Sequence, residues 1–227
     1  IWPGTILPFY GAMFVLAAAM FTWRSRRLLL VGVVAAFAGW LIRWWVSERS
    51  IDDVSTAWLT DPPSRSPRGL VFDLFVNGTH PLLPWLAFFV AGIVLGRLFP
   101  WAGWRAAAIG VGIALYSSAT IVASIGTTGR SAVVLSDHPF DRGIVYTASA
   151  LGTALLAYAT ISWVADRFET SPAIDLLRRA GQLSLTIYVG HALVFNLVVD
   201  WLGLIEPAGV GTALVAAAVY WVVAVVL

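Results

Sequence analysis

Long apolar stretches, separated by polar connections, run along the whole chain. A helix needs about 20 predominantly apolar residues to cross a bilayer. Stretches of roughly that length occur at 5–23, 28–47, 83–99, 102–124, 143–165, 184–204 and 208–227. Only helices satisfy their own backbone hydrogen bonds over such lengths in hydrocarbon. The pattern therefore predicts an all-α, polytopic transmembrane helical bundle with about seven spans, forming a single transmembrane domain over 1–227.

The composition agrees with this pattern and excludes several classes of protein. Hydrophobic residues make up 59% of the chain and charged residues 11%, with a mean hydropathy of +0.85. Soluble domains carry about 25% charged residues, so the apolar excess must face membrane lipids. The chain has no cysteine, which excludes disulfides and cysteine-based metal sites. A net charge of +2 is too small to indicate nucleic-acid binding.

The arginines predict the orientation in a plasma (inner) membrane. Arginine-rich connections alternate with connections that carry many acids, and basic loops remain in the cytoplasm. The acidic connections are then external, and two of them are long, at 48–82 and 125–142. The first contains a turn-rich "TDPPSRSPRG" followed by "LVFDLFVNGTHP", which fits either a short interfacial helix or a re-entrant segment. The arginines assigned to the cytoplasmic side are Arg24, Arg26, Arg27, Arg97, Arg105, Arg167, Arg178 and Arg179.

The stretch "GQLSLTIYVGHALVF", residues 181–195, places polar side chains within an apolar run. At 100° per residue, Ser184, Tyr188 and His191 lie within about 60° of one another on one helical face. Serine commonly hydrogen-bonds neighbouring helices in membranes, and such packing is one interpretation. An ionisable group in this position also indicates a functional site. We therefore take His191 and Tyr188 as catalytic candidates and Ser184 as a substrate-binding candidate.

A second group of candidates flanks the span in "NGTHPLLPWLAFFVAGIVLGRLF", residues 77–99. Asn77 and His80 stand just before the span on the external side, as a substrate-binding and a catalytic candidate, although His80 also fits a solvated loop histidine. Gly92 and Gly96 form a G-x-x-x-G that predicts close approach of another helix. Arg97 ends the span on the cytoplasmic side. It fits either a snorkelling anchor or a contact to a phosphate of a nucleotide-containing donor.

Two further arginines and one acidic loop complete the candidates. Arg43 lies among tryptophans near the outer end of the second span, where it fits an interfacial belt, a partner for an acid of loop 48–82, or a substrate contact. Arg179, on the cytoplasmic rim, is a candidate for binding donor phosphates. Asp137, His138 and Asp141 in "SDHPFD" lack a defined ligand geometry, so we predict no metal site.

Three stretches resemble a known family when taken in order. They are "ILPFYGAMFVLAA", "HPLLPWLAFFVAGIVLGR" and "GQLSLTIYVGHAL", and they resemble the second half of the bacterial YeiB-like proteins with DUF418 domains, relatives of the heparan-α-glucosaminide N-acetyltransferases. The S-x-x-x-Y-x-x-H pattern of Ser184, Tyr188 and His191 is also similar to the C-terminal helix of the acyltransferase-3 group. The resemblance covers nearly the whole chain. It implies a bundle of ten or eleven spans that passes an acyl group from cytoplasmic acyl-CoA to an envelope sugar or lipid.

The resemblance also implies what this chain does not carry. Family members have an early span with an "RG" motif followed by a functional His or Asn, and no such segment precedes Ile1. We therefore expect the C-terminal part of a longer protein, with the N-terminal spans missing and the decisive base in that earlier part. The partners implied are acyl-CoA as donor, an envelope glycolipid as acceptor, and a membrane protein or a second copy of the chain. Two alternatives stay open: an accessory subunit of a membrane assembly, and a lipid or solute transporter.

Overall fold

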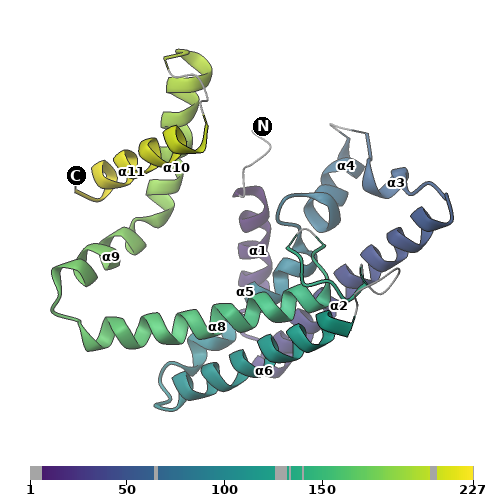
Figure 1. Cartoon of the computed structure of the whole chain (residues 1–227), viewed down its shortest axis with the longest axis horizontal. Coiled ribbons are helices and arrows are strands. Elements are labelled where there is room, and N and C mark those ends of the chain that lie inside the picture. The colour runs from purple at the N-terminus through teal and green to yellow at the C-terminus, as the bar shows by residue number, and fades with distance from the viewer. Residues whose placement is uncertain are drawn as a thin grey trace. The chain divides into compact units, whose positions relative to one another are not determined.

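The structure is a computed structural model, and it describes residues 7–63, 66–125, 132, 134–139, 141–204 and 209–226. Within these ranges the chain forms helices and no strand, so the predicted all-α fold class is confirmed (Figure 1). In chain order the α-helices and the two π-helical turns, η1 and η2, are α1 (Leu7–Met20), α2 (Ser25–Ile51), α3 (Ala57–Thr60), α4 (Pro67–Phe72), η1 (Asp73–Asn77), α5 (Leu82–Leu98), α6 (Trp104–Ile125), α8 (Ile144–Arg167), α9 (Pro172–Gln182), α10 (Ser184–Phe195), η2 (Asn196–Trp201) and α11 (Val210–Val226).

Every apolar stretch predicted to cross the membrane is helical over most of its length. Four helical segments of the described chain are long and apolar enough to span a bilayer: Ser25–Ile51, Trp104–Ile125, Ile144–Arg167 and Ser184–Trp201. A bent pair, Pro67–Asn77 with Leu82–Leu98, makes a fifth candidate if it is counted as one span. Two further apolar helices, Pro8–Met20 and Val210–Val223, are shorter. The chain is therefore a membrane protein, and the total of seven spans stays a prediction.

The chain divides into two compact units, Ile1–Thr160 and Ile161–Leu227. The boundary falls inside α8, so the first unit holds α1 to most of α8 and the second holds the end of α8 with α9 to α11. Each unit has its own packing. The interpretation of 1–227 as one transmembrane domain stays a prediction.

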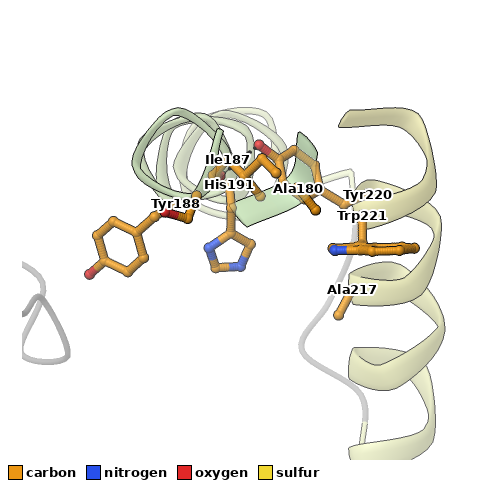
Figure 2. A pocket seen from close by; sticks show the side chains of 8 residues that line it. Ala180, Ile187, Tyr188, His191, Ala217, Tyr220 and Trp221 are labelled. Carbon is orange, nitrogen blue, oxygen red and sulfur yellow. Dashed lines mark hydrogen bonds between the residues drawn. The ribbon is translucent and has the colours of Figure 1, made fainter. Parts of the chain in front are cut away.

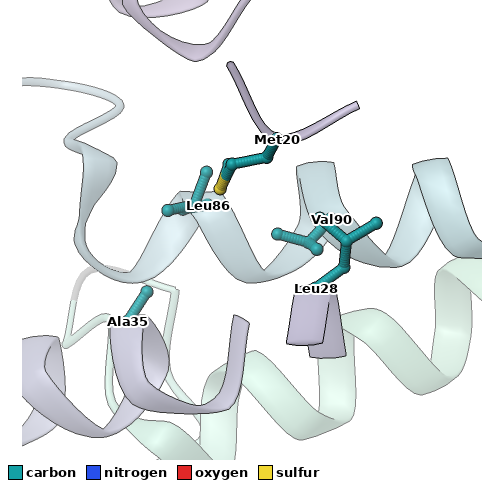
Figure 3. Close-up of a cluster of buried hydrophobic side chains, with 5 residues drawn as sticks. All are labelled: Met20, Leu28, Ala35, Leu86 and Val90. Carbon is teal, nitrogen blue, oxygen red and sulfur yellow. The ribbon is translucent and has the colours of Figure 1, made fainter. Parts of the chain in front are cut away.

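The core of the first unit lies between α2 and α5 (Figure 3). Apolar association in lipid depends on close van der Waals contact, because lipid tails are as apolar as the side chains they replace. Small residues of α2 provide that contact: a Cβ added at Gly32 would lie 3.4 Å from Cα of Ala87, and one at Gly39 would lie 3.2 Å from the nitrogen of Pro84. The buried cluster at this contact consists of Met20, Leu28, Ala35, Leu86 and Val90.

α6 and α8 run alongside each other (Figure 1). Their backbones approach closely at Gly112 and Gly152. A Cβ at Gly152 would stand 2.7 Å from the carbonyl oxygen of Gly112, so no larger residue fits without moving a helix. The G-x-x-x-G predicted to serve such an approach, Gly92 with Gly96, faces open space, with no described atom within 4 Å of a Cβ built on either glycine. Within the described chain, glycines therefore permit close helix approach at Gly32 and Gly39 of α2 and between Gly112 and Gly152, and not at Gly92 and Gly96.

The predicted external loop 48–82 is largely helical. Its turn-rich part ends where Ser66 caps α4: the Ser66 hydroxyl accepts a hydrogen bond from the backbone N–H of Gly69 at 2.9 Å, and Pro67 occupies the first turn. The stretch 70–77 then continues as α4 and η1 and meets α5 at 55°, a geometry that fits a broken span or a re-entrant segment. Of the second predicted loop, 125–142, residues 126–131, 133 and 140 lie outside the described residues.

The second unit begins with an amphipathic helix and ends with two apolar ones. α9 carries its charges on Asp175, Arg178 and Arg179, with apolar residues between and beside them, a pattern typical of helices that lie in a membrane interface. α10 follows almost directly and passes into the π-helical turn η2. Tyr220 of α11 reaches back to α10, where its hydroxyl donates to the carbonyl oxygen of Ile187 at 2.8 Å. This hydrogen bond joins the last two helices.

Candidate functional site

A pocket of about 330 Å³ in the second unit contains the polar residues of α10. The end of α9, one face of α10 and one face of α11 contribute its walls. Ser184, Tyr188 and His191 all line the pocket on its α10 side, as the helical stripe read from the sequence predicts. His191 points into the space between α10 and α11, whereas the ring of Tyr188 points away from α11 (Figure 2). The complete lining is Ala180, Ser184, Ile187, Tyr188, His191, Ala217, Tyr220 and Trp221.

His191 projects from α10 into this pocket (Figure 2). Its imidazole ring stands edge-to-face to Tyr220 of α11, with 5.7 Å between ring centroids, and lies 6.3 Å from the ring of Phe195. Edge-to-face aromatic contacts hold a ring in a defined orientation. Histidine is the side chain best suited to moving a proton near neutral pH. The arrangement therefore presents an oriented proton-transfer group to whatever enters the cavity.

The pocket depends on an approach between α10 and α11 that the sequence reasoning missed. A Cβ at Gly190 would lie 2.6 Å from Oη of Tyr220, so the glycine in "YVGH" leaves room for the tyrosine hydroxyl. Tyr220 is the one tyrosine in the apolar run 209–226. A polar ring tip in such a run usually finds a hydrogen-bond partner. The lone tyrosine in this apolar run could have been noticed in the sequence, but it does not indicate which helix supplies the hydrogen-bond partner.

His80 lies in a second polar cluster, within the first unit. It stands in the short connection between η1 and α5, 4.9 Å from the ring of Trp85 and 6.4 Å from that of Phe9, centroid to centroid. Nδ1 of His80 and Nε1 of Trp85 are both buried, and neither has a hydrogen-bond partner among the described residues. Desolvation by burial lowers the pKa of His80, and the nearby Arg142 lowers it further. His80 is thus a half-buried histidine with a lowered pKa, rather than a fully solvated loop histidine.

Two arginines lie near the connection that holds His80. Nη1 of Arg142 donates to the carbonyl oxygen of Gly78 at 2.7 Å. Arg43 lies 3.9 Å from a carboxylate oxygen of Asp141. The sequence had suggested an acid of loop 48–82 as the partner of Arg43, and the structure corrects this, because the acid belongs to loop 125–142. Burial, followed by repulsion from Arg43, lowers the pKa of Arg142.

Asn77 closes the connection on the other side. Its side-chain nitrogen donates to the carbonyl oxygen of Leu59 at 2.6 Å, which ties the end of η1 to α3. The side chain therefore stabilises the segment that carries His80. Its proposed contact with substrate stays a prediction.

Comparison with known proteins places these sites in a family. The family model of the acyltransferase-3 domain, described as an acyltransferase domain, matches residues 4–227. The chain belongs to the acyltransferase-3 family. A search of curated proteins and a search of solved structures found no match. The predicted resemblance to the acyltransferase-3 group is thereby confirmed.

The two arginines predicted to bind the donor occupy different settings in this acyltransferase-3 chain. Nη1 of Arg97, at the end of α5, donates to the carbonyl oxygen of Trp23 at 2.7 Å, and Nη2 donates to that of Phe21. Arg97 therefore satisfies backbone carbonyls of the turn after α1, as an anchoring residue does. Arg179 pairs with Asp175 one turn earlier on α9, at 2.8 Å, and both side chains are exposed. Phosphate binding by either arginine stays a prediction.

The acidic loop before α8 was the one place where the sequence brought possible metal ligands together. Within the described ranges, which include Asp137, His138 and Asp141, no three histidine, aspartate or glutamate side chains are grouped as a metal site would require.

Proposed function

We propose that this acyltransferase-3 chain takes part in moving an acyl group from cytoplasmic acyl-CoA to a hydroxyl group of a cell-envelope sugar or lipid, as a multi-pass protein of the plasma membrane. The observation that carries the proposal is the joint placement of Ser184, Tyr188 and His191 in one pocket of an acyltransferase domain. Acyl transfer to a hydroxyl needs a group that accepts a proton, and positioned hydrogen-bond donors for the acyl carbonyl. These three side chains supply both kinds of group.

The reaction assigns a role to each residue of the stripe. The acceptor oxygen attacks the thioester carbonyl, a carbon–oxygen bond forms, the carbon–sulfur bond breaks, and the thiolate of coenzyme A leaves. His191 accepts the hydroxyl proton and returns it to the leaving thiolate. Tyr188 and Ser184 donate hydrogen bonds to the acyl carbonyl and the donor. The family likeness implies a further base in an earlier span, and His191 then acts with it from this wall of the site.

The donor phosphates have a suitable partner next to the pocket. Arg179 immediately precedes Ala180, which lines the cavity, and guanidinium groups bind phosphate oxygens in a bidentate manner. Its present pairing with Asp175 is exposed, and such pairs contribute little stability, so incoming phosphates can compete for the arginine. The narrower likeness to YeiB-like proteins and heparan-α-glucosaminide N-acetyltransferases supports acyl-CoA as the donor.

The test follows radiolabel from acyl-CoA into the envelope. Membranes that contain the full protein, His191→Ala or Asn196→Ala are supplied with labelled acetyl-CoA on the cytoplasmic side, and label in the extracted lipid and polysaccharide is counted. Asn196 is a matched control, because its side chain donates to the Ala192 carbonyl of its own helix and does not line the pocket. We expect transfer with the unaltered protein and with Asn196→Ala, and its loss in His191→Ala. Equal transfer by His191→Ala would contradict the proposal.

A further inference from the structure

Two buried hydrogen-bond donors lie side by side at the start of α5. Nε1 of Trp85 can only donate, and Nδ1 of His80 donates in one of the two neutral tautomers. Both atoms are buried, and neither is paired within the part of the chain that the structure describes. Burying such groups without a partner is costly, so in native proteins they are almost always satisfied by protein, water or ligand. The two rings lie 4.9 Å apart between centroids, so both unpaired donors belong to one small region.

Contacts from two other segments of the chain hold this region in place. Phe9 of α1 covers the connection so closely that a Cβ at Gly78 would lie 2.4 Å from its ring. Arg142 holds the same connection through the Gly78 carbonyl, and its own backbone has φ of 50°. Bulky residues rarely adopt the left-handed region, and those that do are concentrated at functional sites. The surrounding packing therefore holds Arg142 beside His80 at some conformational cost.

The charges near this region are unbalanced. Two guanidinium groups, Arg142 and Arg43, lie with one carboxylate, Asp141, whose contact to Arg43 is long at 3.9 Å. Tyr146 is the remaining titratable neighbour that affects Arg142. Arg142 has five N–H donors, and its hydrogen bond to Gly78 uses one nitrogen. Among the described residues this group therefore carries two positive charges and one negative charge, and one further negative charge would balance it.

We propose that His80, Trp85 and Arg142 bind an anionic oxygen group, a phosphate or a carboxylate, carried by the acceptor of the acyl group. The inference rests on the proposed function, because that function makes the bound molecule an acceptor of the acyl group. The sequence predicts that this end of α5 lies on the external side, where the acceptor is expected. Phosphate and carboxylate oxygens accept several hydrogen bonds at once and balance a guanidinium charge, which a neutral hydroxyl does not do. The acceptor class is then an anionic lipid or an anionic sugar rather than a neutral sugar.

Binding is measured directly, so the result does not depend on acyl transfer. The full protein is labelled with 5-fluorotryptophan, placed in phosphatidylcholine nanodiscs, and the fluorine resonance of Trp85 is assigned with Trp85→Phe. The probes are phosphatidylglycerol in the disc, inorganic phosphate, and glucuronate. We expect a saturable shift of the Trp85 resonance with at least one probe. A response to phosphatidylglycerol alone identifies a lipid headgroup as the source, and a response to phosphate or glucuronate identifies a soluble anion.

Variants distinguish this site from general charge attraction. Arg142→Met should weaken binding by about 30-fold or more, since removing one partner of a shielded charge pair costs that much. Arg49→Met is the matched control: Arg49 lies over the ring of Trp45 at 5.1 Å, on the same predicted side, and its loss should leave affinity within about two-fold. His80→Phe keeps the aromatic packing and removes the ring nitrogens, and it should also weaken binding.

No shift with any probe, or equal losses in Arg142→Met and Arg49→Met, would overturn the inference. Acyl transfer that fails while anion binding persists would count against the proposed function alone.

Discussion

Gly190 allows α11 to pack against α10, and Gly190→Ala together with Tyr220→Phe tests how the pocket is built. The alanine Cβ would stand 2.6 Å from Oη of Tyr220, so the hydroxyl must leave the carbonyl of Ile187. The next ring atom, Cζ, is 3.8 Å away, an ordinary contact. The conflict therefore involves the hydroxyl group alone. Phenylalanine, which lacks that group, should accept alanine without strain.

The magnitudes follow from two opposing terms. Losing the tyrosine hydrogen bond costs about 0.6 kcal/mol on average in a membrane and up to about 1.5 kcal/mol elsewhere. Exchanging a helical glycine for alanine returns up to about 1 kcal/mol. Gly190→Ala alone should therefore change the free energy of unfolding by less than about 1 kcal/mol. In the Tyr220→Phe background the same exchange should be stabilising, because the hydrogen bond is already gone.

The measurement is a double-mutant cycle of reversible unfolding in mixed detergent micelles. We expect a coupling free energy of about 1 kcal/mol between the two positions, within the range typical of side chains in contact. Additive effects, with a coupling below about 0.3 kcal/mol, would refute the α10–α11 packing described above, since distant sites add to within that margin.

Three further predictions follow from the first unit. Gly152→Ala places a Cβ 2.7 Å from a carbonyl oxygen of α6, and backbone atoms yield little, so we expect a loss of about 1–3 kcal/mol in thermal unfolding; the matched Gly110→Ala, which faces open space, should be neutral or stabilising, and equal effects would contradict the crossing. Gly78→Ala places a Cβ 2.5 Å from a backbone carbonyl of η1 and should destabilise the turn before α5 by a similar amount, seen as faster proteolysis there. Arg142→Met should raise the pKa of His80 towards 6.5 but only partway, because burial remains the larger cause; a histidine NMR titration in which this pKa does not rise would contradict the contact.

The polar stripe could be predicted because it depends on one helix alone. Helical periodicity places Ser184, Tyr188 and His191 on one face wherever the helix lies, and the structure shows all three at one pocket. The opposite wall could not be predicted. Tyr220 meets Ile187 across 33 positions, and no local pattern specifies a contact between segments so far apart.

Motifs of small or charged residues predicted a kind of contact but not its partner. Gly92 and Gly96 have the spacing for close helix approach, yet among the described residues such approaches occur at other glycines, Gly112 with Gly152 among them. Small residues permit contact, but they do not specify which helix makes it. Arg43 was expected near an acid, and it pairs with one from the later loop. In both cases the contact partner depends on how the helices and loops pack in three dimensions, which a local motif does not specify.

The central claim, that His191 moves a proton during acyl transfer, is tested most directly by separating binding from reaction in His191→Ala. The acyl-CoA dissociation constant and the transfer rate are measured on the full protein in nanodiscs, beside the unaltered protein. The account predicts a dissociation constant within about two-fold and a rate lowered by about 100-fold or more, since a general acid–base group contributes about 10²–10⁴-fold. A rate within about three-fold of the unaltered protein, well below that range, would contradict the account.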